Sequence, residues 1–208
     1  MVKRSKSSDR WLKEHAADKY VKRAHKEGYR SRSAFKLEEL DAAERLLKPG
    51  MLVVDLGAAP GGWSQYAAKV LNGKGSVFAL DILPMDPVTG VEFIEGDFRE
   101  PGPLEALRDL LKGRPVDLVM SDMAPNMSGI DAVDQPRALD LAELALEFSR
   151  EVLKPGGVFL AKVFQGAGFD GYLKAVRGEF ATVRMKKPPA SRARSAEMYL
   201  LASGRRIL

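Results

Sequence analysis

The chain has 208 residues, 45% of them hydrophobic, which is enough for one domain with a packed core. It contains no cysteine, which excludes disulfides, thiolate metal sites and cysteine nucleophiles, and its two histidines disfavour a histidine-based centre, so we predict no metal. The net charge is +5, and no apolar run approaches the roughly 20 residues of a membrane helix, so we expect a cytoplasmic protein without a membrane partner.

The N-terminal part of the chain is strongly basic. Residues 1–36 contain twelve lysines and arginines against four acidic residues, a balance of +8. We expect residues 1–9 to form a disordered basic tail, because they are charged, serine-rich and aperiodic. Residues 10–208 are predicted to form a single domain that begins with a basic helical extension over residues 10–48.

Helices and strands are predicted from the spacing of apolar residues. In the extension we predict helices over 11–26 and 33–46, the second with Ser33 as its N-cap. Strands are predicted over 51–57, 76–82, 91–97, 116–122, 158–164, 181–186 and 197–202, and further helices over 63–71, 104–111, 134–153 and 169–179. This alternation predicts an α/β fold, a Rossmann-like, doubly wound and mostly parallel sheet of seven strands with helices on both faces.

Ligands of such sheets bind beyond the carboxyl ends of the strands, and the first strand ends in a glycine-rich loop. The loop is DLGAAPGGW, in which Gly57 and Gly61 permit a tight turn and the close approach of a ligand, while Pro60 stiffens the chain. It matches neither the dinucleotide pattern GxGxxG nor the phosphate-binding pattern GxxxxGK[ST]. Taken alone, such a loop is more often a plain structural turn.

Three acids follow the next strands in order. Asp81 lies 24 positions after Gly57, where a carboxylate can accept hydrogen bonds from both ribose hydroxyls of an adenosine. Asp97 could accept from an adenine amino group, and Asp122 could lie beside a reactive sulfonium. Each acid alone could be an ordinary strand-end residue. Together they indicate a nucleoside cofactor without a pyrophosphate, which fits S-adenosylmethionine, with Asp55 and Asp122 near its positive charge.

The C-terminal part is basic as well. Residues 184–206 contain seven basic side chains and a single acid, Glu197. Basic segments at both ends around an acidic middle suggest a polyanionic partner, although solvated surface faces would give the same composition.

Several motifs together resemble the FtsJ/RrmJ family of S-adenosylmethionine-dependent methyltransferases, which act on the ribose 2′-hydroxyl of a uridine in 23S ribosomal RNA of the large subunit. The motifs are YRSRSAFKL, DLGAAPGGWSQ, LDI, GDF, SDMAPN, AKVFQG and SRARSAEMYL, within residues 10–203. The resemblance implies a Lys-Asp-Lys-Glu tetrad that matches Lys36, Asp122, Lys162 and Glu197. It also implies the methyltransferase fold and cofactor residues that match Gly61, Trp63, Asp81, Asp97 and Asp122.

The chemistry can be argued without the resemblance. A ribose hydroxyl is a poor nucleophile, so its attack on a methyl group needs a proton acceptor. Lys162 lies in the otherwise apolar strand 158–164, where a charge is costly unless it is paired or neutral, although a lysine extending to solvent is an alternative. We predict that Lys162 accepts the proton, that Asp122 orients it, and that Lys36 and Glu197 position the ribose and Lys162. Burial and Lys36 would favour a neutral Lys162 and the two carboxylates would oppose it, so the sequence leaves this balance open.

The expected partner is ribosomal RNA, bound by a protein that is itself a monomer. The predicted RNA contacts are Arg30, Arg32, Lys186, Lys187, Arg192 and Arg194, and Tyr29 or Phe164 could stack on an extruded base. Other interpretations remain open: a methyltransferase acting on transfer RNA, on messenger RNA caps, on a protein or on a small molecule, and a non-catalytic RNA-binding factor of ribosome assembly.

Overall fold

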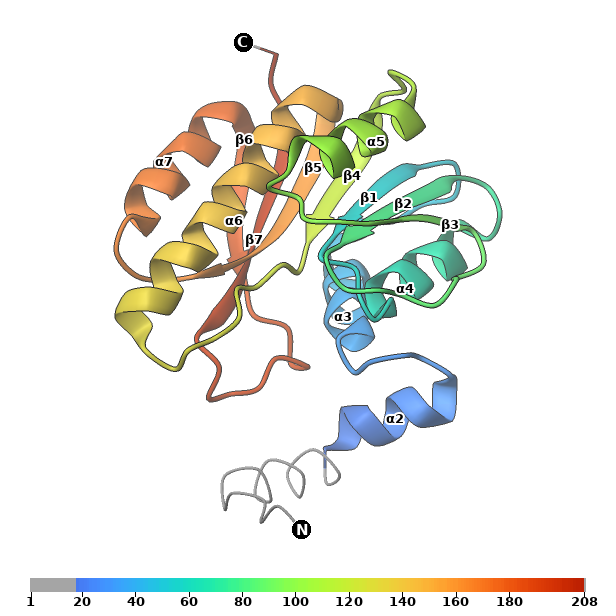
Figure 1. Cartoon of the computed structure of the whole chain (residues 1–208), viewed down its shortest axis with the longest axis horizontal. Helices are drawn as coiled ribbons and strands as arrows, with labels where there is room; N and C mark the ends of the chain where they lie inside the picture. Colours follow the sequence, from blue (N-terminus) through green and yellow to red (C-terminus); the bar gives the residue numbers. More distant parts are fainter. Residues whose placement is uncertain (1–17, 208) are drawn as a thin grey trace.

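One seven-stranded sheet organises the chain in the computed structural model, which describes residues 18–207 (Figure 1). Its strands are β1 (Leu52–Leu56), β2 (Ser76–Asp81), β3 (Val91–Glu95), β4 (Val116–Ser121), β5 (Leu153–Phe164), β6 (Phe180–Lys186) and β7 (Glu197–Arg205). The strand order is β3-β2-β1-β4-β5-β7-β6, and only β7 runs antiparallel to its neighbours among these strands. The predicted Rossmann-like, mostly parallel sheet of seven strands is confirmed.

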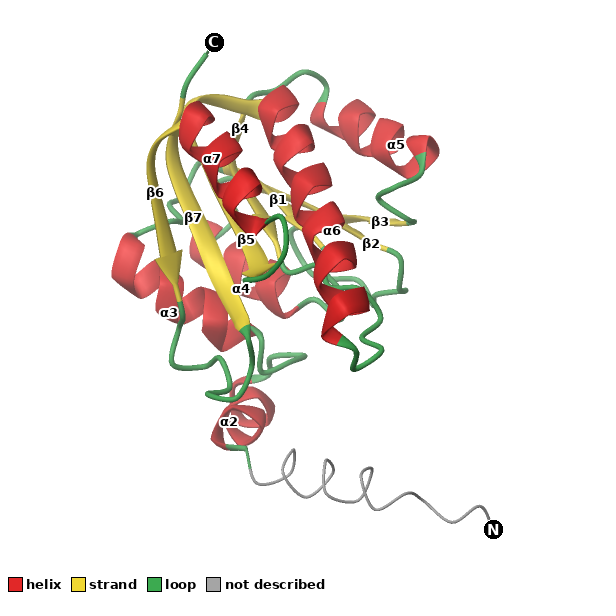
Figure 2. Ribbon diagram, turned by 90° about the vertical axis from the view of Figure 1, so that its left-hand side faces the viewer, coloured by secondary structure: helices red, strands yellow, loops and turns green. Residues whose placement is uncertain are grey.

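Helices cover both faces of the sheet (Figure 2). They are α2 (Lys19–Glu27), α3 (Ala34–Glu44), α4 (Gly62–Leu71), α5 (Pro101–Leu111), α6 (Asp131–Val152) and α7 (Phe169–Glu179). The apolar core on one face joins α5, α6 and α7 to the strands, and the core on the other face joins α3 and α4 to them. Because both faces are covered, the inner strands are buried along their length, as the continuous apolar run of β1 predicted.

The strand order reverses between β1 and β4, the point at which ligands bind in sheets of this kind. Asp55 of β1 pairs in register with Met120 of β4, and Leu56 pairs with Ser121, so the loops that follow these two strands leave the sheet side by side. We call the edge formed by the carboxyl ends of the parallel strands the carboxyl edge. In Figure 1 it is the lower edge, where α2 and the β6–β7 loop also lie.

The N-terminal extension packs through a small apolar cluster that also includes Ala190 of the β6–β7 loop. Tyr20, Tyr29 and Phe35 are buried in it, and the ring of Tyr29 meets that of Phe35 edge to face. Tyr29 is therefore not available to stack on an RNA base, which corrects that prediction. Phe164 is half-buried, so stacking by Phe164 stays a prediction.

Several predicted helices and strands begin or end at other residues in the structure. Ser33 precedes α3, but its side chain caps no helical N–H and instead contacts the Ser31 hydroxyl, so the predicted cap is wrong. α5 begins at Pro101 rather than at residue 104, since proline is well tolerated in the first turn of a helix. β5 begins at Leu153, because the segment predicted to separate helix from strand joins the strand, with an irregular register opposite β4. The predicted tail 1–9 and the predicted helix as far as residue 17 lie outside the described residues.

Candidate active site

A buried chain of hydrogen bonds and ion pairs lies at the carboxyl edge. Lys162 Nζ is 3.2 Å from Asp122 Oδ1 and donates to the Asp122 main-chain carbonyl at 2.5 Å. The Tyr199 hydroxyl donates to the same Asp122 oxygen at 2.8 Å and accepts from Lys36 Nζ at 3.1 Å. Lys36 Nζ also lies 2.7 Å from Glu197 Oε1. The four residues of the predicted tetrad thus form one continuous network.

Four separate elements supply these side chains. Lys36 comes from α3, Asp122 follows β4, and Lys162 lies near the end of β5. Glu197 and Tyr199 come from the start of β7, where Lys162 pairs with Tyr199. Because β7 runs antiparallel, its first residues reach the edge at which the parallel strands end.

Tyr199 is the member of the network that sequence reasoning missed. Its side chain is fully buried and its hydroxyl joins the two halves of the tetrad. A signal was present, because Tyr199 is two residues after Glu197 in a strand, and residues at that spacing share one face of a sheet. The tyrosine was not singled out because an apolar position in a buried strand needs no functional explanation.

The network keeps its acid ionised and its phenol neutral. Burial opposes the charge of Asp122, but the ammonium groups of Lys162 and Lys36 and the hydroxyl of Tyr199 outweigh it, so the pKa of Asp122 is lowered. Burial, followed by the neighbouring charges of Asp122 and Glu197, raises the pKa of Tyr199 well above its usual value. Tyr199 therefore acts as a neutral donor to the carboxylate.

Lys162 is held away from bulk water. Its side chain is 8% exposed and that of Asp122 is 17% exposed, which rules out the alternative of a lysine extending to solvent. The carboxylate and the main-chain carbonyl of Asp122 are therefore the groups that contact the Lys162 amine.

The glycine-rich loop turns tightly against the β4–α6 loop. Gly57 has φ +78°, and a Cβ there would lie 2.8 Å from the main-chain nitrogen of Met123. Only glycine fits this position without displacing the backbone. Asp81 stabilises the same loop from β2, because its carboxylate accepts from the main-chain N–H groups of Ala59 and Leu83, both at 2.8 Å.

Asp55 is a buried carboxyl at the end of β1. Its Oδ2 accepts from the Ser64 hydroxyl at 2.6 Å, whereas its Oδ1 is buried and has no hydrogen-bond partner among the described residues. Burial raises the pKa of Asp55 to about 7, against the opposing effect of Ser64 and with a further contribution from the charge of Asp122. A buried acceptor without a donor can take a hydrogen bond from a cationic ligand group.

Two other predicted cofactor residues are engaged within the protein. The Arg99 guanidinium and main-chain N–H donate to Asp97, and these hydrogen bonds lower the pKa of Asp97. Trp63 is 2% exposed, its ring packs against Tyr199, and its indole N–H donates to the Ser33 carbonyl. Its side chain belongs to the core, so contact of residue 63 with a ligand would have to come from its main chain.

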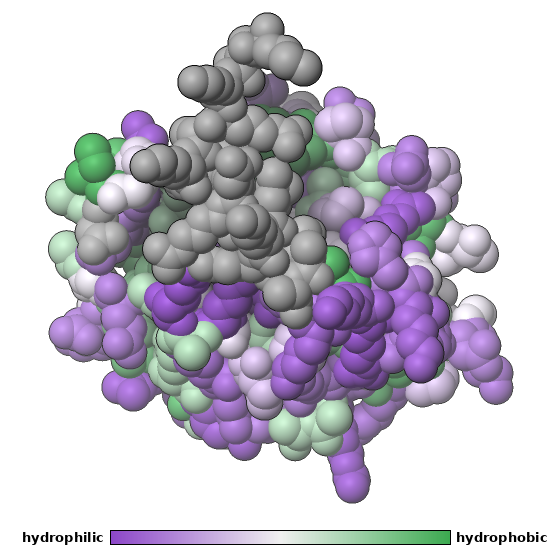
Figure 3. Space-filling view, turned by 90° about the horizontal axis from the view of Figure 1, so that it is seen from below, coloured by the Kyte–Doolittle hydropathy of each residue, from purple (hydrophilic) through white to green (hydrophobic). Residues whose placement is uncertain are grey.

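The arginines predicted to contact RNA also bind parts of this chain. Arg30 donates to three main-chain carbonyls, and Arg32 donates to the Ala190 carbonyl at 2.7 Å. The Asp18 carboxylate lies 3.0 Å from Nε of Arg32 and 3.7 Å from Nη2 of Arg192. These contacts hold α2 and the β6–β7 loop together at the carboxyl edge, where Figure 3 shows mainly hydrophilic side chains among the described residues.

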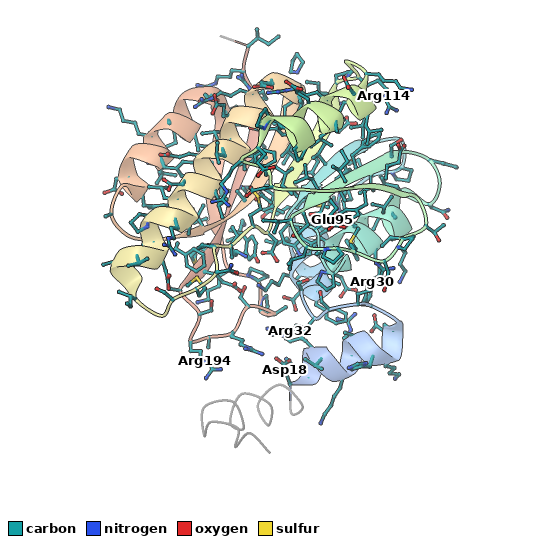
Figure 4. The ribbon with its side chains drawn as sticks, in the orientation of Figure 1. Asp18, Arg30, Arg32, Glu95, Arg114 and Arg194 are labelled. Atoms are coloured by element: carbon teal, nitrogen blue, oxygen red, sulfur yellow. The ribbon has the colours of Figure 1, made fainter. Side chains whose placement is uncertain are left out.

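The remaining predicted RNA contacts lie on β6 and the loop that follows it. Lys186 forms an ion pair with Glu44 at 2.5 Å, and Lys187 donates to the Ser195 carbonyl at 2.8 Å. Arg194 lies on the same loop, toward the lower edge of the molecule in Figure 4.

Two features are absent from the part of the chain that the structure describes. Between residues 18 and 207, no helix is both long and apolar enough to cross a membrane. In the same part of the chain, no group of three or more histidine, cysteine or acidic side chains is arranged to hold a metal ion.

Comparison with known proteins points to one family. Residues 29–205 match the FtsJ-like methyltransferase family. The chain is 63% identical over 200 residues to ribosomal RNA large subunit methyltransferase E of Chromohalobacter salexigens, covering 96% of this chain and 95% of that protein.

Solved structures agree with this assignment. A Plasmodium falciparum protein assigned as a ribosomal RNA methyltransferase superposes with a TM-score of 0.77 at 28% identity, over 85% of this chain and 98% of that one. Human methyltransferase-like protein 13, solved in complex with SAH, shares the fold alone, with a TM-score of 0.56 and 16% identity over 79% of this chain and 81% of that one.

The raised pKa of Asp55 makes a prediction for stability. The folded protein retains a proton on Asp55 that the unfolded chain has already lost, so the free energy of unfolding should fall as pH rises from about 4 to about 7. The Asp55→Asn variant should lack this pH-dependent fall in the free energy of unfolding, which amounts to at most about 4 kcal/mol. Urea denaturation of both proteins at several pH values measures it. Parallel pH profiles for the two proteins would show that Asp55 does not titrate in this way.

Proposed function

Because this chain belongs to the FtsJ-like methyltransferase family, we propose that it transfers a methyl group from S-adenosylmethionine to the ribose 2′-hydroxyl of a uridine in 23S ribosomal RNA of the large subunit. The observation that carries the proposal is the buried network of Lys36, Asp122, Lys162 and Glu197 at the carboxyl edge. The name of the relative that is 63% identical supports ribosomal RNA of the large subunit as the substrate, and the uridine 2′-hydroxyl is the target that the family resemblance implies.

The carboxyl ends of β1, β2 and β3 carry groups that suit S-adenosylmethionine. The unpartnered Asp55 oxygen suits the methionine ammonium group, and Asp81 has lone pairs left for ribose hydroxyls after its two main-chain contacts. Gly57 and Gly61 let the main chain approach a ligand closely, and Asp97 is the residue that would accept from the adenine amino group. The cofactor supplies an electrophilic methyl group on a positively charged sulfur.

The network provides the proton acceptor for the hydroxyl. Lys162 accepts the 2′-hydroxyl proton, and it must first be neutral to do so. Asp122 and Tyr199 hold the amine in place, while Lys36 and Glu197 position the ribose. Much of the acceleration comes from holding hydroxyl and methyl in line.

RNA reaches this site over the basic carboxyl edge. We propose that Arg192, Arg194 and Lys187 of the β6–β7 loop contact the phosphate backbone, because that loop adjoins the strand that carries Glu197 and Tyr199. Arg32 binds the same loop through the Ala190 carbonyl and would present it to the RNA.

Replacing the proposed acceptor should abolish turnover without abolishing cofactor binding. We expect Lys162→Ala to lower kcat by roughly 10²- to 10⁴-fold, the usual contribution of a proton acceptor. The measurement is methyl transfer to large subunits from cells that lack the enzyme, with titration of S-adenosylhomocysteine as a binding check. Lys154→Ala is the matched control, since Lys154 lies on the same strand at its other end and pairs with Asp117. Normal turnover by Lys162→Ala would refute the assignment.

The bridging hydroxyl of Tyr199 should matter in its own right. Tyr199→Phe removes the donor to Asp122 and the acceptor for Lys36 while keeping the ring, so kcat should fall about 10- to 100-fold, as for loss of a hydrogen bond to a charged group. Tyr172→Phe is the control, because that buried hydroxyl donates to the Ala142 carbonyl outside the site. Equal kcat values for the two variants would argue against a role for the bridge.

A further inference from the structure

Arg30 lies half-buried in the connector between α2 and α3 and joins two loops of the cofactor region. Its Nη1 donates to the carbonyls of Pro60 at 3.3 Å and Asp86 at 2.5 Å, and its Nη2 donates to the Pro87 carbonyl at 2.6 Å. The Arg30 main-chain N–H donates to Gln65 of α4 at 2.8 Å, which fixes the origin of the side chain. The guanidinium is thus engaged by main-chain carbonyls of two surface loops.

The two loops that Arg30 joins follow β1 and β2, the strands whose ends carry Asp55 and Asp81. Pro60 belongs to the glycine-rich loop after β1, whereas Asp86 and Pro87 belong to the loop after β2, which follows Asp81. The turn at Gly61 has φ +109° and closes against the same side chain, since a Cβ at Gly61 would lie 3.1 Å from Arg30 Nη1. Arg30 and the Asp81–Ala59 hydrogen bond are therefore two separate ties between these loops.

The neighbouring arginine makes a different connection. Arg32 is two residues further along the same connector, but it binds Asp18 and the Ala190 carbonyl of the β6–β7 loop. Figure 4 shows the two arginines apart, with Arg30 beside α4 and Arg32 toward the β6–β7 loop. Two arginines that are only two residues apart in the sequence thus contact different loops, Arg30 those after β1 and β2, and Arg32 the β6–β7 loop.

We propose that Arg30 is a positioning residue for S-adenosylmethionine, which sets the spacing of the two nucleoside-binding loops, and that it does not contact RNA. The proposal rests on the proposed function in one respect, the identity of the ligand between these loops. A planar guanidinium with five donors in a fixed fork can serve three carbonyls at once, whereas an ammonium group cannot match that geometry. Holding the loops in their binding arrangement before the ligand arrives removes an ordering cost from binding.

The test measures cofactor affinity in the absence of RNA. For Arg30→Lys we expect the Kd of S-adenosylhomocysteine, measured by isothermal titration calorimetry on the full chain, to rise about tenfold, which corresponds to about 1.4 kcal/mol. In steady-state assays KM for S-adenosylmethionine should rise by a similar factor. The value of kcat, KM for the ribosomal substrate and the salt dependence of RNA binding should stay within about twofold of wild type.

A matched control separates this role from general stability. Arg114 also donates to two main-chain carbonyls, those of Leu110 and Leu111, and lies near the upper edge of the molecule in Figure 4, well away from Arg30. Arg114→Lys should leave the Kd of S-adenosylhomocysteine unchanged. Thermal melts of both variants set an assay temperature at which each is folded. Arg30→Ala is the second variant, and millimolar guanidinium chloride should restore part of its cofactor affinity.

Three results would overturn the proposal, and they differ from one another. Unchanged affinity for S-adenosylhomocysteine together with a weaker salt dependence of RNA binding would make Arg30 a phosphate contact. Wild-type values for every parameter would show that the Arg30 contacts do not influence binding. Failure of the wild-type protein itself to bind S-adenosylhomocysteine would refute the proposed function along with this inference.

Discussion

The carboxylate of Asp122 is the group on which the rest of the site depends. It binds the Lys162 ammonium and the Tyr199 hydroxyl, and through Tyr199 it is linked to Lys36 and Glu197. Two amines and two carboxylates in a largely buried volume are stable only together, because removing any one leaves a charge without its partner. Neutral Tyr199 joins the two ion pairs without adding charge. The positive and negative charges of the network therefore balance before any ligand binds.

The topology of the sheet explains how distant residues form this group. The parallel strands β1 to β5 bring their carboxyl ends to one edge, which delivers Asp122 and Lys162. β7 enters the sheet antiparallel between β5 and β6, so Glu197 and Tyr199 at its start reach the same edge. α3 contributes Lys36 from outside the sheet. The antiparallel strand is therefore what completes the site.

Two acids that end neighbouring strands have opposite environments. Asp55 is buried with only the Ser64 hydroxyl for a donor, and burial raises its pKa to about 7. Asp122 is also shielded from water, yet the two lysines lower its pKa. Chemically identical side chains on adjacent strands thus differ because of what surrounds each one. The arginines of the N-terminal extension also contact different parts of the site. Arg30 donates to loops near Asp55, and Arg32 donates to the loop that precedes β7.

The sequence by itself determined the seven strands, their alternation with helices and the anomaly of Lys162 in an apolar strand, because each is a local pattern of apolar residues and breaks in it. Its motifs also pointed to the tetrad, through resemblance to a family. Only the tertiary structure decided which charges are paired. Arg30 and Arg32 contact different loops, Trp63 lies in the core, and Tyr199 joins Lys36 to Asp122, because each of these contacts links residues far apart in the chain. The spacing of apolar residues along the chain indicates which face of a helix or strand a side chain lies on. It does not indicate which residues from distant parts of the chain will contact that side chain in the folded protein.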